Sequence, residues 1–66
     1  MVITLYKNSI TIVDEQHFEK VDIDNYQTHF DGVSASGGIY ILDITKNNQI
    51  IITIRTNNLI VIDNRK

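Results

Sequence analysis

Residues branched at Cβ dominate this chain and constrain its fold more than any motif does. Thirteen of the 66 residues are isoleucine, whereas alanine occurs once and leucine three times. Branching at Cβ stiffens the first side-chain torsion and favours the extended strand, while alanine and leucine are among the strongest helix formers. The composition therefore predicts an all-β protein, and 66 residues suffice for a single small domain, residues 1–66.

Small size and the absence of cysteine limit how such a domain can be stabilised. A domain of this size class buries only about 60% of the surface that its unfolded chain exposes. With no cysteine in the sequence, neither disulfides nor thiolate metal sites can form. Oligomerisation is the usual remaining way to complete a small core, so we expect a homo-oligomer.

Charge and hydropathy argue against several classes of partner. The formal net charge is −2, which offers no general attraction for nucleic acid or an anionic membrane. The longest uninterrupted apolar run, residues 59–62, is far shorter than the roughly 20 residues of a membrane-spanning helix. No basic segment followed by an apolar one marks a signal peptide. We therefore expect a cytoplasmic protein that binds neither membrane nor nucleic acid.

The first thirteen residues have the pattern of a β-hairpin. A two-residue loop at Lys7-Asn8 gathers the isoleucine and leucine side chains of both flanking segments on one face, as a half-buried antiparallel pair requires. A three-residue loop would oppose Leu5 to Thr11 and mix the two faces. The even register predicts these opposed pairs: Val2–Val13, Ile3–Ile12, Thr4–Thr11, Leu5–Ile10 and Tyr6–Ser9.

Three further strands are predicted in the C-terminal third, at residues 39–45, 49–55 and 59–62. Asparagine tolerates the left-handed backbone conformation, so residues 46–48 and 56–58 can each form a three-residue hairpin loop. The three strands then form a meander with these opposed pairs: Ile44–Ile50, Leu42–Ile52, Tyr40–Ile54, Ile54–Ile60 and Ile52–Ile62. Its second face would carry these apolar side chains: Ile39, Ile41, Ile51, Leu59 and Val61.

That second face is too apolar to lie in water, so we expect the middle of the chain or another subunit to cover it. With the N-terminal hairpin, the meander predicts a small antiparallel sheet of five to six strands. We expect this sheet to curl into a barrel or sandwich, or to be completed by oligomerisation.

The middle segment, residues 14–31, is acidic and admits two structures. It holds six of the eight acidic residues and a single basic one, Lys20. Residues 19–24 alternate polar and apolar side chains with period two, which predicts a strand. The alternative is a short helix capped by Asp14, with Phe18 and Val21 among its inward residues. The poor helix formers of residues 21–24 favour the strand.

Residues 31–38 are rich in glycine and serine and are predicted to be a flexible loop. The sequence GVSAS at residues 32–36 lacks the second glycine of a nucleophile elbow, and a strand rather than a helix follows it. The lysine of a phosphate-binding P-loop is also missing. Free N–H groups in such a loop can still hold an anion. The candidate ligand residues are Gly32, Ser34, Ser36, Gly37 and Gly38.

No other motif predicts a metal, a cofactor or a reaction. The Asp22-Ile23-Asp24-Asn25 run resembles the start of a calcium loop but lacks its glycine and its closing glutamate. The twelve-residue spacing of His17 and His29 matches no zinc motif. Packing explains the five aromatic residues better than base stacking does, because no basic groove accompanies them.

Protein binding is the function that best fits a small acidic domain without a catalytic motif. We expect a non-enzymatic interaction module whose acidic segment recognises a basic partner. Its size, acidity and composition agree with a phage or mobile-element accessory protein that binds and inhibits a host factor. The predicted partner-binding residues are Asp22, Asp24, Tyr26 and Asp31. The alternative is an oligomeric protein that binds a nucleotide or another anion through residues 32–38.

Overall fold

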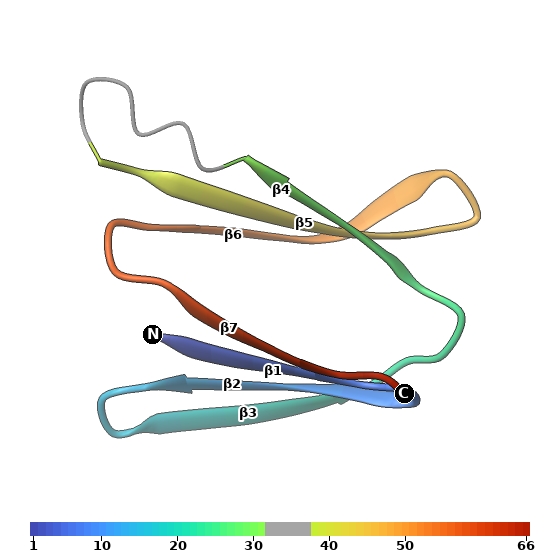
Figure 1. Cartoon of the computed structure of the whole chain (residues 1–66), viewed down its shortest axis with the longest axis horizontal. Coiled ribbons are helices and arrows are strands. Elements are labelled where there is room, and N and C mark those ends of the chain that lie inside the picture. Colours follow the sequence, from blue (N-terminus) through green and yellow to red (C-terminus); the bar gives the residue numbers. More distant parts are fainter. Residues whose placement is uncertain (32–37) are drawn as a thin grey trace. The chain divides into compact units, whose positions relative to one another are not determined.

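Every regular element in the described part of the chain is a β-strand (Figure 1). A computed structural model describes residues 1–31 and 38–66. The strands are β1 (Val2–Tyr6), β2 (Ser9–Asp14), β3 (His17–Asp22), β4 (Gln27–Asp31), β5 (Tyr40–Lys46), β6 (Gln49–Thr56) and β7 (Ile60–Asn64). The expected all-β class is confirmed, with seven strands in this part of the chain instead of five to six.

The strands belong to two sheets in two compact units. The first unit, Met1–Asn25 with Leu59–Lys66, holds a four-stranded sheet in the order β3-β2-β1-β7. The second unit, Tyr26–Asn58, holds a three-stranded antiparallel sheet in the order β4-β5-β6. The first unit is therefore discontinuous in sequence, since the chain leaves it after Asn25 and returns at Leu59.

The N-terminal hairpin has the predicted register, with Val2, Ile3, Thr4 and Leu5 opposed to Val13, Ile12, Thr11 and Ile10. The Lys7-Asn8 turn uses no positive φ angle, so it avoids the conformation that would strain a lysine. Apolar and polar residues alternate along both strands. With a two-residue turn between them, only one register separates the apolar from the polar side chains.

The acidic segment that follows is extended, as the strand interpretation predicted. β3 pairs antiparallel with β2 along its whole length, and Asp14 is opposed to His17 across the Glu15-Gln16 turn. The strand is His17–Asp22, two residues earlier than predicted, and the helix alternative is wrong. Strand β4 lies in the same sheet as β5 and extends it sideways.

The predicted meander is wrong at its last strand. β7 pairs with β1, in parallel, and places Ile60 beside Val2 and Val61 beside Ile3. The expected pairs between β6 and residues 60 and 62 do not form, because the chain passes from one unit to the other between Asn58 and Leu59. An apolar strand fits either neighbour equally well, so the alternation of side chains could not choose between them.

The register between β5 and β6 also differs from the prediction. The loop is the two-residue turn Asn47-Asn48, whose φ angles are 55° and 63°, which favours asparagine at both positions. Leu42 is therefore opposed to Ile54, and not to Ile52. A bulge follows the turn, since Ile44 meets Ile52 but Thr45 meets Ile50, which leaves Ile51 as the extra residue.

Because of these pairings, the residues predicted for the second face of the meander do not lie on one sheet. Leu59 and Val61 belong to the first unit, while Ile39, Ile41 and Ile51 belong to the second. Each unit instead buries apolar residues of its own, most of them alternate residues of its central strands. The buried residues are Ile3, Leu5 and Ile10 in the first unit and Tyr26, Leu42, Ile44 and Ile54 in the second.

Replacement of Ile10 tests the buried side of the four-stranded sheet. Because Ile10 is fully buried, we expect Ile10→Ala to lower the free energy of unfolding by about 2–5 kcal/mol and Ile10→Val by about 0.5–1.5 kcal/mol. Val13→Ala, on the exposed side of the same strand, should change it by about 0.5 kcal/mol. Urea unfolding measures all three, and equal losses at both positions would contradict this orientation of β2.

Replacement of Asn48 tests the β5–β6 turn. An alanine at φ 63° carries the left-handed penalty of about 1–2 kcal/mol that asparagine partly avoids, whereas glycine carries none. We therefore expect Asn48→Ala to lower the melting temperature and Asn48→Gly to leave it unchanged or raise it. Asn57→Ala, in a turn without positive φ, is the matched control. A larger effect at Asn57 would refute the two-residue turn.

Candidate interaction surface

On the more polar face of the four-stranded sheet, one row of apolar side chains is largely exposed. Directly opposed residues of a sheet share a face, so the registers place Phe18, Val13, Val2 and Ile60 in one row across all four strands. Phe18 is 64% exposed, Ile60 55% and Val13 38%. We name this side the Phe18 face. Its remaining strand residues are Thr4, Tyr6, Ser9, Thr11, Lys20, Asp22, Ile62 and Asn64.

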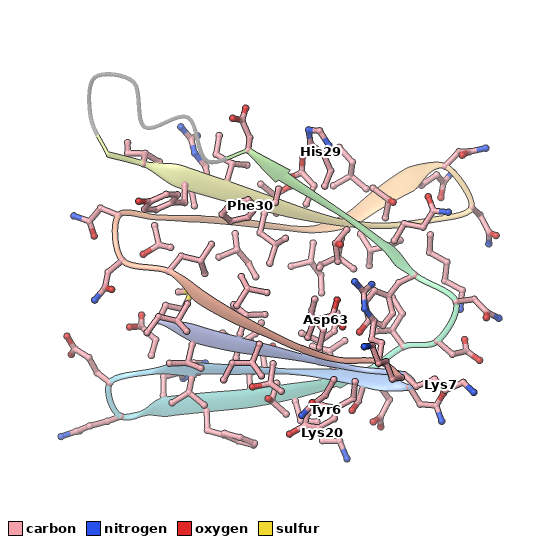
Figure 2. All side chains as sticks on the ribbon, viewed as in Figure 1. Tyr6, Lys7, Lys20, His29, Phe30 and Asp63 are labelled. Atoms are coloured by element: carbon pink, nitrogen blue, oxygen red, sulfur yellow. The ribbon has the colours of Figure 1, made fainter. Side chains whose placement is uncertain are left out.

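The side chains confirm the separation of the two faces. Figure 2 shows Tyr6 and Lys20 on one side of the sheet and Asp63 on the other. On the Phe18 face, the Lys20 Nζ atom lies 3.9 Å from Asp22 Oδ1. Both groups are exposed, so this ion pair contributes little to stability. The four side chains of the row are hydrocarbon, so they can contribute to binding only by being buried against another molecule.

Negative charge is concentrated in the part of the sequence that contains Phe18. Between Asp14 and Asp24 the chain has five carboxylates and one basic residue, Lys20. The first unit has six acidic residues against four lysines and arginines, which accounts for the whole net charge of −2. The second unit has two of each and is neutral. Phe18 therefore belongs to the acidic β2–β3 hairpin, in which Asp22 shares its side of the sheet while Asp14 and Glu19 lie on the other side.

The structure brings together two of the four predicted partner-binding residues. Asp22 and Asp24 line one open depression of about 270 Å³ with Asn8 and Ile23. The Ile23 N–H donates to the Asn8 carbonyl at 3.1 Å, which fixes this stretch beside the β1–β2 turn.

The other two predicted partner-binding residues lie in the second unit. Asp31 ends β4, and Tyr26 is only 8% exposed. Tyr26 therefore belongs to the buried side chains of that unit, and its ring offers little surface to a partner.

Most of the alternative ligand loop lies outside the described residues. Gly32, Ser34, Ser36 and Gly37 fall there, so their prediction stays untested. Gly38 is described, and its φ angle of 62° is one that glycine adopts without strain. Nothing lies within 4 Å of where a Cβ would sit, so backbone conformation and not crowding favours glycine there.

The two histidines lie in different units. His17 Nε2 is 3.9 Å from Glu19 Oε1, and both side chains are exposed. His29 is opposed to Asp43, and Asp43 is opposed to Thr53, which makes a polar row across the three-stranded sheet. In the residues described, no three histidines or carboxylates are grouped to hold a metal ion.

The His29 row has the residue types of a nucleophilic triad but the wrong order. Thr53 Oγ1 donates to Asp43 Oδ1 at 2.9 Å, so the carboxylate takes the central position. In a working triad the imidazole lies between the carboxylate and the hydroxyl and accepts the hydroxyl proton. This row therefore cannot activate Thr53 through His29.

A second exposed phenylalanine lies in the three-stranded sheet. Phe30 and His29 project to opposite sides of β4 (Figure 2). The rings of Phe30 and Tyr40 are stacked, with centroids 6.1 Å apart and planes 16° apart. Phe30 is 52% exposed and thus comparable with Phe18, but its unit is neutral.

The end of β7 carries a bidentate ion pair. Arg65 donates from Nε to Asp63 Oδ1 at 2.9 Å and from Nη2 to Oδ2 at 2.7 Å. The Arg65 main-chain N–H also reaches Oδ1, at 3.2 Å. Hydrogen bonds from the Arg65 side chain are the main cause that lowers the pKa of Asp63.

The Phe18 face was missed from sequence because it depends on the β2–β3 register. The pairing of Phe18 with Val13 follows from a two-residue turn at Glu15-Gln16. This turn contains no glycine or asparagine, the residues from which a tight turn is usually predicted. Glu15 nevertheless adopts a φ angle of 54° there. The place of Ile60 in the row depends on the parallel β1–β7 pairing, which no local signal predicts.

No protein-family model, curated protein or solved structure matches this chain. In the described part of the chain there is no helix of the length and apolarity needed to cross a membrane.

The ion pair with Arg65 should lower the pKa of Asp63 measurably. Because the carboxyl binds a proton less readily in the folded chain, the pair stabilises the fold at neutral pH. That contribution is lost as the pH falls through the depressed folded-state pKa. NMR titration should show the pKa of Asp63 rising toward its ordinary value in Arg65→Gln. Lys66→Gln, the smallest of the causes, should change it little, and an unchanged pKa in Arg65→Gln would refute the assignment.

Proposed function

We propose that this chain is a non-enzymatic protein-interaction module that binds a basic partner protein through the Phe18 face. The observation that supports it is the row Phe18–Val13–Val2–Ile60, which spans the whole width of one sheet and is exposed at every residue except the half-buried Val2. A contiguous apolar surface bordered by polar residues is typical of an interaction site.

Phe18 is the expected anchor of the interface. An aromatic side chain buries a large area when it enters a pocket, and such residues dominate binding energy at protein interfaces. Phe18 projects from a paired strand, so fewer conformations are lost on binding than from a mobile loop.

The acidic hairpin defines the chemistry of the partner. Five carboxylates lie between Asp14 and Asp24, in the segment that contains Phe18, so the complementary surface is an apolar pocket with lysines or arginines at its rim. Such charges chiefly accelerate association and decide which partner is accepted, while the apolar contact sets the lifetime of the complex.

Site-specific cross-linking identifies the partner. A photoreactive phenylalanine analogue placed at residue 18, in cells of the natural source, should cross-link one protein. The same analogue at residue 30 is the matched control, because Phe30 has a similar exposure in the neutral unit. Equal cross-linking at both positions, or none at position 18, would contradict the proposal.

Binding measurements with this chain and the purified partner then test which side chains contribute to the interface. We expect Phe18→Ser to weaken binding about 30-fold or more, as for an interface anchor, and Phe30→Ser to leave it unchanged. Asp22→Lys with Asp24→Lys should slow association at low salt, and Asp31→Lys in the second unit should not. Calorimetry and surface plasmon resonance measure these effects. Equal effects of the Phe18 and Phe30 variants would overturn the assigned face.

A further inference from the structure

The four outer strands of the two sheets differ in how well their edges are protected. Open edges pair readily with another strand unless charges or bulges prevent it. In β7 the first three residues, Ile60, Val61 and Ile62, are aliphatic and exposed, and none is charged. The protecting features elsewhere are Glu19, Lys20 and Asp22 in β3, Asp31 in β4, and the bulge at Ile51 with Arg55 in β6.

We infer that β7 pairs antiparallel with β7 of a second copy of this chain, about a two-fold axis at Val61. The two four-stranded sheets then become one continuous sheet. Among the described residues, β7 has one hydrogen-bonded neighbour, β1, so its other edge is the one that the second copy meets.

The main chain of β7 sets which groups are offered at that edge. The Ile60 N–H donates to the Met1 carbonyl at 2.9 Å, so the main-chain groups of Ile60 point toward β1. Successive residues of a strand point these groups to alternate sides. Val61 and Asp63 therefore present their N–H and C=O outward. Two copies of Val61 can then exchange both hydrogen bonds across the two-fold axis.

The side chains suit the same register. Centred on Val61, the pairing opposes Ile60 to Ile62 and Asp63 to Leu59, so no carboxylate meets another. A two-fold axis at Ile62 would oppose Ile60 to Asn64, and one at Asp63 would oppose two carboxylates, which is unfavourable. Asp63 is also neutralised within its own chain by Arg65.

Long-range charge also favours this edge for a second copy. Both copies carry the net charge of −2 in the first unit, concentrated on the β2–β3 hairpin. Pairing through β7 places the two β3 strands at opposite ends of the joined sheet, about 33 Å apart at the usual strand spacing. That separation exceeds the Debye length of about 8 Å at physiological salt, so the hairpins hardly repel. The Phe18 face stays open, and the inference does not depend on the proposed function.

Cysteine scanning tests the register, since the chain has no cysteine of its own. Val61→Cys should form an intermolecular disulfide, because Cα atoms of a hydrogen-bonded pair lie about 5.5 Å apart, within disulfide range. Ile60→Cys should not, because its two copies would be about 8 Å apart. Cross-linking of Ile60→Cys but not Val61→Cys, or of neither, would overturn the inference.

Sedimentation tests the dimer in solution. We expect the unmodified chain to approach twice its mass of 7.6 kDa as its concentration rises. Val61→Pro removes the outward N–H without touching the β1 ladder and should be monomeric with an unchanged circular dichroism spectrum. If Val61→Pro does not fold, the cysteine pattern decides. A monomeric unmodified chain, or a folded Val61→Pro dimer, would refute the pairing. Phe18→Ser should remain dimeric, which separates this inference from the proposed function.

Discussion

The parallel pairing of β7 with β1 is the interaction on which the rest of the first unit depends. It holds the two ends of the described chain in one sheet and makes Ile60 the fourth member of the Phe18 row. It also turns the main-chain groups of Ile60 inward, which leaves those of Val61 at the open edge. The composition of the Phe18 face and the main-chain groups at the open edge of β7 are therefore two consequences of one register. The two surfaces would bind different partners.

The parts of the fold that could be predicted are those in which one register alone separates apolar from polar side chains. The β1–β2 hairpin is such a case, and its four opposed pairs are as predicted. The β5–β6 hairpin is not, because the apolar run Ile50-Ile51-Ile52 tolerates a shift of the partner strand. The register of this hairpin is set by two consecutive positive φ angles in the turn and by a bulge. The sequence pattern reveals neither of them.

The partner-binding role of Asp22 and Asp24 stays a prediction, and the structure shows only that the two residues are close together. Asp22 and Asp24 lie beside one depression because they are two positions apart in the sequence, although β3 ends at Asp22 and the predicted alternation does not continue to Asp24. Phe18 could be recognised as an exposed residue only after its opposed partner Val13 and the neighbours beyond it were known. A surface that spans four strands depends on three registers at once, and one of them joins strands far apart in sequence.

The discontinuity of the first unit has a consequence for how the molecule folds. Val2 and Ile60, which lie side by side, are 58 positions apart in the sequence. Pairing across such a distance closes a long loop and tends to be slow, whereas the β1–β2 and β2–β3 hairpins form from adjacent residues. During folding, β1 therefore spends time as an unprotected edge before β7 arrives. A β7 strand from another molecule that reaches this edge first would yield an exchanged assembly, so folding at high concentration favours intertwined chains.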